Sequence, residues 1–197
     1  MLAIFASYQG AAETATWILL RNLWGLVETV PECIASAATV RVEHNLSRGN
    51  VRTAKTIAMQ TMAICTGLSG VFSLVLLDTR RYLAWCFSLD ETLETMILEI
   101  IPYIAICQPF ITAGVTADYL NEVLGKHKVS VKISTIIDMC FTLPVAAIFT
   151  YLLHYNIEGL ASAICMGFAA TGVINIFLFF NTDWQYAAKK ILKYTEK

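Results

Sequence analysis

Long apolar stretches alternate with short polar connectors along the whole chain. A helix needs about 20 mainly apolar residues to cross the roughly 30 Å of hydrocarbon in a bilayer, and backbone hydrogen bonds must close within each helix there. The stretches that reach this length are 14–40, 57–77, 96–120, 129–153 and 157–180. A sixth, 1–8, is too short and is interpreted as the end of a further helix. The pattern predicts an all-α, polytopic transmembrane bundle with about five full spans and one partial N-terminal span.

Composition places this bundle in lipid. Of 197 residues, 57% are hydrophobic and 15% are charged, whereas soluble domains carry about 25% charged residues. Too few polar side chains are present to cover a surface that faces water. The net charge of −1 provides no basic excess for nucleic acid, so none is expected as a partner.

Basic residues gather in alternate connectors, which predicts the orientation. Four follow the first full span, three follow the third and four lie in the C-terminal tail, against two after the second span and none after the fourth. Cytoplasmic connectors carry the excess of Lys and Arg. We therefore expect a multi-pass integral membrane protein with a cytoplasmic C-terminus. The residues on the richer side are Arg41, Arg48, Arg52, Lys55, Lys126, Lys128, Lys132, Lys189, Lys190, Lys193 and Lys197.

The tail, 182–197, is expected to be a separate unit from the membrane lobe, 1–181. It opens with Thr182 and Asp183, which are good N-cap residue types, and then mixes apolar and basic residues at helical spacing. This predicts a short amphipathic helix on the inner membrane surface, with Trp184 and Tyr186 in the headgroup layer. A frayed, solvated tail is the alternative.

Charged residues inside spans are the first candidates for function, because each costs about 2.5–3.5 kcal/mol at the bilayer centre. Arg21, Glu28 and Glu32 share one face of the first full span, since they are spaced by seven and four residues. Such a stripe suits a proton or a sodium ion. Asp138 lies deep in the fourth full span and is a second candidate. The alternatives are that Arg21 and Glu32 reach water near the span ends, and that Asp138 makes a structural hydrogen bond.

Aromatic residues and prolines within the spans suggest a cavity and hinges. Trp24, Tyr103 and Phe110 are candidates to line a cavity for flat, lipophilic cations, although such side chains also face lipid or pack between helices. Each proline removes one helical hydrogen bond, so it is a hinge or a static kink. The proline hinge candidates are Pro31, Pro109 and Pro144, with Pro102 as a further proline inside a span.

Signatures of enzymes and resident cofactors are missing from the sequence. The six cysteines are scattered without CxxC spacing, the three histidines form no HExxH arrangement, and the chain has no P-loop or GxSxG elbow. We therefore expect no metal site, no cofactor and no enzymatic activity.

The stretch 22–50 resembles the eighth helix and following loop of the multidrug and toxic compound extrusion (MATE) transporters. Further matches run in order through 101–110, 125–128 and 143–144 to 158–160 and 182–184, which resemble the tenth, eleventh and twelfth helices and the tail of the family. Two departures are Glu43-His44 for the usual Gly-Asn and Ser47 for a usual Gly. The matching residues of the first stretch are Asn22, Pro31, Ala37, Ala38, Thr39, Val40, Arg41, Val42, Leu46, Gly49 and Asn50.

The resemblance implies a fold of two six-helix lobes around a central cavity, of which this chain is most of the second lobe. It also implies export of small organic, often cationic, compounds in exchange for protons or sodium. An incomplete transporter would need the missing N-terminal lobe or a second copy as a partner. Two alternatives are a lipid-linked oligosaccharide flippase of the same superfamily and a truncated, non-transporting membrane subunit.

One departure from the family concerns cation coupling. Many MATE transporters have an acidic residue in the tenth helix, three positions after the Gln that matches Gln108, and here that position is Ile111. By the same resemblance, Gln108 is a candidate to line the cavity. Coupling by Glu28 or Asp138 instead is therefore our hypothesis.

Overall fold

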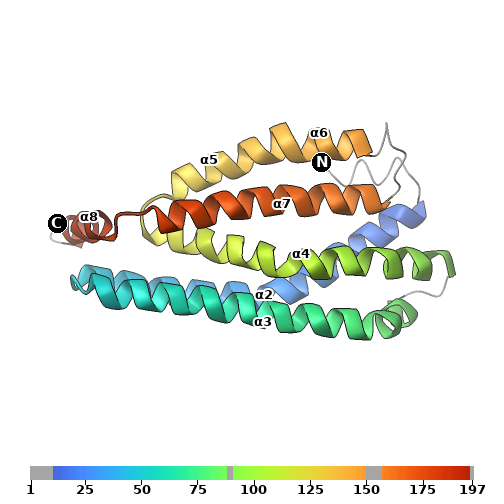
Figure 1. Cartoon of the computed structure of the whole chain (residues 1–197), viewed down its shortest axis with the longest axis horizontal. Helices are drawn as coiled ribbons and strands as arrows, with labels where there is room; N and C mark the ends of the chain where they lie inside the picture. The colour runs from blue at the N-terminus through green and yellow to red at the C-terminus, as the bar shows by residue number, and fades with distance from the viewer. Residues whose placement is uncertain (1–10, 88–90, 150–156, 196–197) are drawn as a thin grey trace.

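The computed structural model describes residues 11–87, 91–149 and 157–195, and Figure 1 shows helices running along one long axis. The expected stretch 1–8 lies outside these residues. The elements are α2 (Ala11–Ser47), α3 (Val51–Phe87), α4 (Glu91–Val123), α5 (His127–Ile137), the π-helical turn η1 (Asp138–Thr142), α6 (Leu143–Ala147), α7 (Ile157–Phe180) and α8 (Trp184–Thr195).

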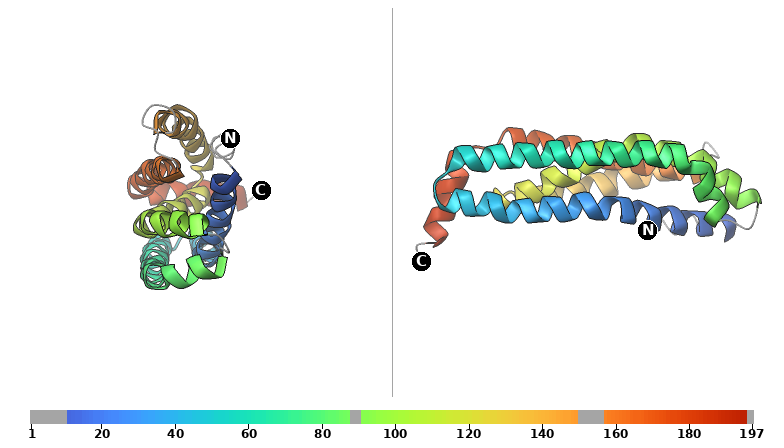
Figure 2. Two further views of the ribbon diagram at one scale, coloured as in Figure 1. Left: turned by 90° about the vertical axis from the view of Figure 1, so that its right-hand side faces the viewer. Right: turned by 90° about the horizontal axis from the view of Figure 1, so that it is seen from below.

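Alternate connectors lie at the same end of the bundle. The α2–α3 turn, the α4–α5 turn and α8 are together at the left of Figure 1, and α8 lies across the bundle axis there (Figure 2). Gly49 and Gly125, with φ of 76° and 75°, occupy the left-handed region that ends a helix, so both turns are short. The connectors that the sequence shows to be rich in Lys and Arg are therefore on one side.

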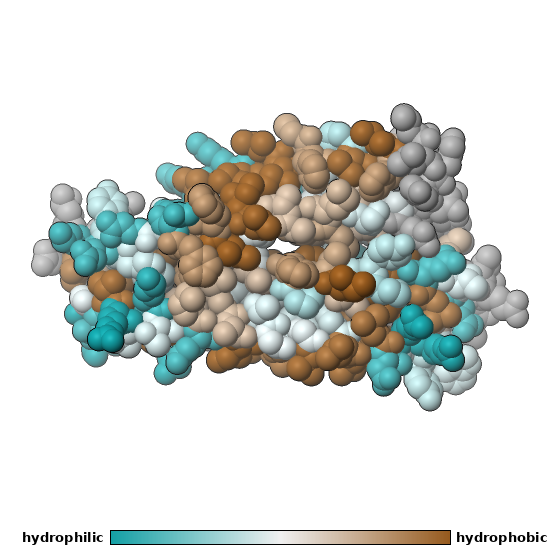
Figure 3. All heavy atoms as spheres, in the orientation of Figure 1, coloured by the Kyte–Doolittle hydropathy of each residue, from teal (hydrophilic) through white to brown (hydrophobic). Residues whose placement is uncertain are grey.

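Of the five full spans expected from the sequence, the first, which corresponds to α2, is not among the helices apolar enough to cross a membrane by length and composition. By length and composition, the helices able to cross a membrane are Val51–Cys86, Glu94–Val123, His127–Ala147 and Gly159–Phe180. α2 is as long as α3, but it carries Arg21, Glu28 and Glu32 in its middle, whereas the charged residues of α3 lie toward its two ends. It packs on α3 and α4, which shelter part of this polar surface. Figure 3 shows hydrophobic residues across the middle of the visible face and hydrophilic ones toward the ends.

The fourth expected span, 129–153, is interrupted. α5 gives way to the π turn η1, and α6 begins at Leu143. Pro144 has no backbone N–H to give to the carbonyl of Cys140, so the regular α-helical bonding fails at this point. Residues 150–153 lie outside the described part of the chain. In contrast, α2 and α4 continue through Pro31, Pro102 and Pro109.

Two glycines set the distance between α4 and α7. A Cβ added to Gly114 would overlap Gly172 Cα, so these backbones touch. Gly167 makes a similar contact with Thr142 of η1, because a Cβ there would overlap the Thr142 hydroxyl. α7 is thereby held between α4 on one side and the broken helix on the other.

α8 is partly built into the bundle. Its N-terminus is capped by Asp183, whose Oδ1 accepts hydrogen bonds from the backbone N–H of Gln185 (3.0 Å) and Tyr186 (3.2 Å). Trp184 is buried, and its ring meets that of Phe179 edge-on, with centroids 5.5 Å apart. This ring therefore fills space between the helix ends, and a headgroup position for Trp184 stays a prediction. Tyr186 is exposed.

Candidate functional site

A cluster of polar side chains surrounds Glu28 inside the bundle. Glu28 on α2 is only 7% exposed, although it lies midway along a 37-residue helix. Its Oε2 accepts hydrogen bonds from the Gln108 amide and from the Thr112 hydroxyl, the latter at 3.0 Å. The hydroxyls of Thr112 and Ser69 are 2.9 Å apart and hydrogen-bonded. We call Glu28, Ser69, Gln108 and Thr112 the Glu28 cluster.

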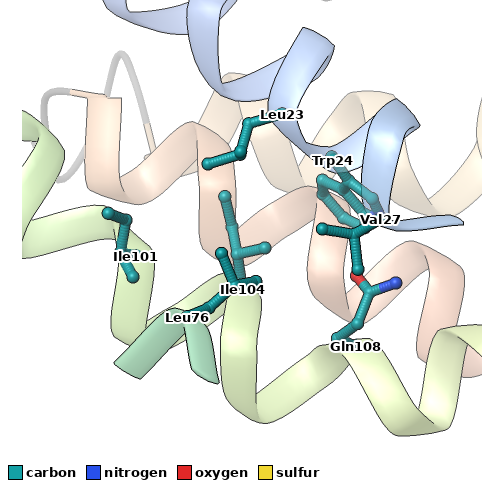
Figure 4. A pocket seen from close by; sticks show the side chains of 7 residues that line it. All are labelled: Leu23, Trp24, Val27, Leu76, Ile101, Ile104 and Gln108. Carbon is teal, nitrogen blue, oxygen red and sulfur yellow. The ribbon is translucent and has the colours of Figure 1, made fainter. Parts of the chain in front are cut away.

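The Glu28 cluster has more acceptors than donors. Oε1 of Glu28 and Oε1 of Gln108 are both buried and have no hydrogen-bond partner within the described part of the chain. A buried acceptor without a donor costs about 1–3 kcal/mol. A proton, a cation or a water molecule would relieve this cost. Gln108 also borders a cavity of about 10 Å³, at the lower limit for one water, where its side chain reaches toward Val27 of α2 (Figure 4).

A larger cavity, the main cavity, opens beside Glu28 between α2, α4 and α7. Its volume is about 490 Å³, which lies within the usual range of about 300–1,000 Å³ for small-molecule sites. Three aromatic residues, Trp17, Trp24 and Phe168, contribute to its wall, and the rings of Trp24 and Phe168 are 5.5 Å apart. The ionisable residues of the wall are Arg21, Glu28 and Glu32.

Sequence reasoning placed several of these residues correctly on one face. Arg21, Trp24, Glu28 and Glu32 all border the main cavity, but only Glu28 is buried, whereas Trp24 and Glu32 are half-buried and Arg21 is exposed. Arg21 and Glu32 also border an open groove on the outer side of α2. That outer side is mixed, because it exposes Asn22 and Thr29 together with the large apolar residues Ile18 and Leu26.

The other candidates lie elsewhere. Tyr103 and Phe110 are 44% and 67% exposed and are not among the residues that border the main cavity, so a cavity-lining role stays a prediction for them. Gln108 and Ile111 are three residues apart on α4. Gln108 belongs to the Glu28 cluster, and Ile111 borders the main cavity. Asp138 begins η1 and borders a second, smaller pocket.

Ser69 and Thr112 are functional candidates that sequence reasoning missed. A signal was present, since Gln108, Thr112 and Thr116 recur every four residues within an otherwise apolar helix, as do Ser69 and Ser73. All of these side chains are buried. Polar residues at this spacing share one helical face and indicate a polar contact between helices.

The long apolar helices define a multi-pass integral membrane protein, with a cavity between α2, α4 and α7. The MatE family matches residues 1–152, and this chain belongs to that family. Residue identity with individual relatives is low. It is 23% with Multidrug and toxin extrusion protein 1 of Homo sapiens, over 92% of this chain and 32% of that protein. It is also 23% with Protein DETOXIFICATION 14 of Arabidopsis thaliana, over 82% and 33%.

A solved structure has the same fold. The crystal structure of the eukaryotic MATE transporter AtDTX14 matches with a TM-score of 0.88 and 18% identity, and the match covers 92% of this chain and 41% of that one. The chain spans about a third of the length of the curated relatives that it matches.

Proposed function

We propose that this chain is a lobe of a cation-coupled antiporter that exports small organic, often cationic, compounds, with Glu28 as the coupling carboxylate. The observation that carries this proposal is the unpartnered Oε1 of a buried Glu28 beside the main cavity. An ionised carboxylate in this position is costly unless a proton or a cation neutralises it. Glu28 therefore holds either the coupling cation, H⁺ or Na⁺, or a cationic substrate.

Competition for Glu28 supplies the coupling. A substrate cation and a coupling cation cannot both neutralise one carboxylate, so binding of one favours release of the other. The main cavity supports a substrate of this kind, because its aromatic rings offer cation–π contacts next to the carboxylates Glu28 and Glu32. Ile111 leaves the tenth-helix position without an acid, and Glu28 supplies the charge from the neighbouring helix.

The polar residues among the exposed side chains of α2 support a partner for this lobe. Asn22, Thr29 and Arg21 are exposed there and would be poorly solvated by lipid tails. We propose that a first lobe, or a second copy of the chain, covers this side. We also propose that the end formed by the α2–α3 and α4–α5 turns and α8 is cytoplasmic, on the strength of its basic residues.

The charge of the main cavity favours an organic cation over a lipid-linked pyrophosphate. Its wall has two carboxylates and one arginine, whereas a pyrophosphate needs a surplus of cationic groups. A flippase is therefore the weaker alternative. A non-transporting subunit is the outcome to expect if no transport is found.

Transport by the reconstituted protein tests the proposal. Proteoliposomes with an outward gradient of H⁺ or Na⁺ are assayed for uptake of a fluorescent organic cation. Glu28→Gln keeps the shape of the side chain and one acceptor oxygen but removes its charge, so we expect uptake driven by the gradient to be lost. Glu43→Gln, at an exposed position on the same helix, is the matched control and should transport normally. Normal gradient-driven uptake by the Glu28→Gln protein would refute coupling at Glu28.

A further inference from the structure

Gln108 and Glu28 meet through two planar end groups of similar shape. The Gln108 amide nitrogen donates a hydrogen bond to Oε2 of Glu28. The other oxygen of each group, Oε1, is buried and has no hydrogen-bond partner among the residues that the structure describes. Gln108 is fully buried, Glu28 is 7% exposed, and the Gln108 side chain extends from α4 toward α2 (Figure 4). The two groups are therefore joined on one side only.

The open side of this pair lacks a hydrogen-bond donor. An amide carbonyl oxygen and a carboxylate oxygen both accept hydrogen bonds, and neither donates one. The Gln108 amide nitrogen is already engaged with Glu28 Oε2 and with the Thr112 hydroxyl, the latter at 3.4 Å. The hydroxyls of Thr112 and Ser69 are bonded to Glu28 Oε2 and to each other. None of these donors reaches either Oε1 atom.

A single proton removes this deficit. A proton from water in the main cavity, which Glu28 borders, forms an O–H bond with Glu28 Oε1 and turns that atom into a donor. The unpartnered Oε1 of Gln108 is then its acceptor. The acid and the amide are joined by two hydrogen bonds in one ring, and the cost of two buried, unpartnered acceptors disappears.

A sodium ion fits the same place poorly. Hard cations such as Ca²⁺ and Mg²⁺ are held by about six or more oxygen ligands. Oε2 of Glu28 already accepts from two donors, so the Glu28 cluster offers the two Oε1 atoms. A further buried, unpartnered oxygen belongs to Ser73, one helical turn from Ser69 on α3 and outside the cluster. Even with Ser73, the set is about half of what a hard cation takes.

Other charged and titratable groups near Glu28 leave the place of the proton open. Arg21 and Glu32 border the main cavity from the same helix, and they have opposite signs. Cys65 of α3 interacts with Glu28, but its thiol is directed to the Pro31 carbonyl oxygen at 3.6 Å. The residues of α4 and α7 that border the main cavity within the described ranges are all apolar. Arg21 is exposed, so no buried basic side chain neutralises Glu28 there.

We propose that Gln108 makes Glu28 a proton site rather than a sodium site, by accepting the hydrogen bond of the protonated carboxyl group. This inference rests on the proposed function, because it names the coupling ion of the same carboxylate. It also gives Gln108 a part in the exchange. Protonation directs Oε1 of Glu28 to Gln108 and removes the negative charge that an organic cation in the main cavity would meet, so the ring and the bound substrate exclude each other.

The test is infrared difference spectroscopy of the purified protein in detergent, at low pH minus high pH. Such spectra contain the C=O stretch of each carboxyl group that takes up a proton, and the band that Glu28→Gln removes belongs to Glu28. Hydrogen bonding of the carboxyl group lowers the frequency of this stretch. We expect a Glu28 band below the frequency of an unbonded carboxyl group. The band should not change when NaCl replaces choline chloride at constant ionic strength.

Variants of Gln108 separate its role from general packing. Gln108→Met keeps the length of the side chain but removes the amide, so the Glu28 band should shift to higher frequency. Gln108→Asn has an amide one methylene shorter, which ends short of Glu28, and should shift the band in the same direction if Gln108→Met is not monodisperse. Thr116→Val is the matched control and should leave the band unchanged, because Thr116 is a buried polar residue on the same face of α4 that bonds to Cys65.

Three results would overturn the proposal: no Glu28 band, a band that Na⁺ removes, or a band indifferent to both Gln108 variants. Transport distinguishes this failure from that of the proposed function. Export driven by Na⁺ that Glu28→Gln abolishes, in a protein without a Glu28 band, would refute the proton site and leave the proposed function standing. A Glu28 band that depends on Gln108, in a protein that exports no organic cation, would refute only the proposed function.

Discussion

The contact between α4 and α7 leads to a prediction about Gly→Ala substitutions, which should stabilise the protein at one position and destabilise it at another. Gly114→Ala places a Cβ inside 3.0 Å of Gly172 Cα, a distance that real Cβ atoms do not reach. Ordinary contact between carbon atoms requires about 3.5–4.0 Å, so the helices must separate by roughly 1 Å or more. Gly70→Ala on α3 is the matched control, because a Cβ there meets nothing within 4 Å.

The expected changes in the free energy of unfolding have opposite signs. Gly70→Ala should stabilise the protein by about 0.5–1 kcal/mol, which is the usual gain from replacing glycine inside a helix. Gly114→Ala has the same gain but also an overpacking cost of about 1–3 kcal/mol, increased because the obstacle is backbone rather than a movable side chain. Gly172→Ala is intermediate, since its Cβ would lie 3.3 Å from Gly114 Cα and 3.4 Å from the Phe110 carbonyl oxygen.

Thermal unfolding in detergent measures this order. A change of 1 kcal/mol moves the Tm of a protein of this size by about 2–4 °C. We expect Tm to fall in the order Gly70→Ala, wild type, Gly172→Ala, Gly114→Ala. A Tm for Gly114→Ala equal to or above that of Gly70→Ala would mean that α4 and α7 do not touch at these glycines.

Two further predictions concern the Glu28 cluster and α8. Thr112→Val removes a buried hydroxyl that is hydrogen-bonded to both Glu28 and Ser69, so it should lower stability by about 1–3 kcal/mol. Thr29→Val is the control, because the Thr29 hydroxyl bonds only to its own helix. Equal Tm values for the two variants would contradict the Glu28 cluster. Trp184→Ala should cost about 3–5 kcal/mol because the ring is buried against Phe179, whereas exposed Tyr186→Ala should stay within about 0.5 kcal/mol; similar unfolding curves would show that α8 does not pack on the bundle.

Part of the candidate site was available from the sequence. The spacing of Glu28 and Glu32 placed both on one face of the first full span, and both border the main cavity. The sequence did not distinguish them, because the depth of a side chain depends on which helix packs over it. α4 supplies Gln108 and Thr112 at the level of Glu28, which is thereby buried and hydrogen-bonded, whereas Glu32 stays half-buried.

The same reason explains why the orientation of Phe110 and the pocket shared by two carboxylates could not be predicted from the sequence. Phe110 lies two residues after Gln108, on the opposite side of α4, so it faces outward while Gln108 faces α2. Asp118 and Asp138 are 20 residues apart in the sequence and belong to different helices, and no local pattern indicates that they border one pocket.

The sequence by itself determined the helical class, the approximate positions of the helices, the alternation of connectors and the capped tail helix. These features depend on the length of apolar runs and on residues close together in the chain, so local chemistry is sufficient. Only the tertiary structure decided which faces meet. Two contacts depend on the rotation of each helix about its axis. They are the hydrogen bond between Glu28 and Gln108, which are 80 residues apart, and the backbone contact between Gly114 and Gly172. That rotation is set by the packing of all the helices together, which no single stretch of the sequence contains.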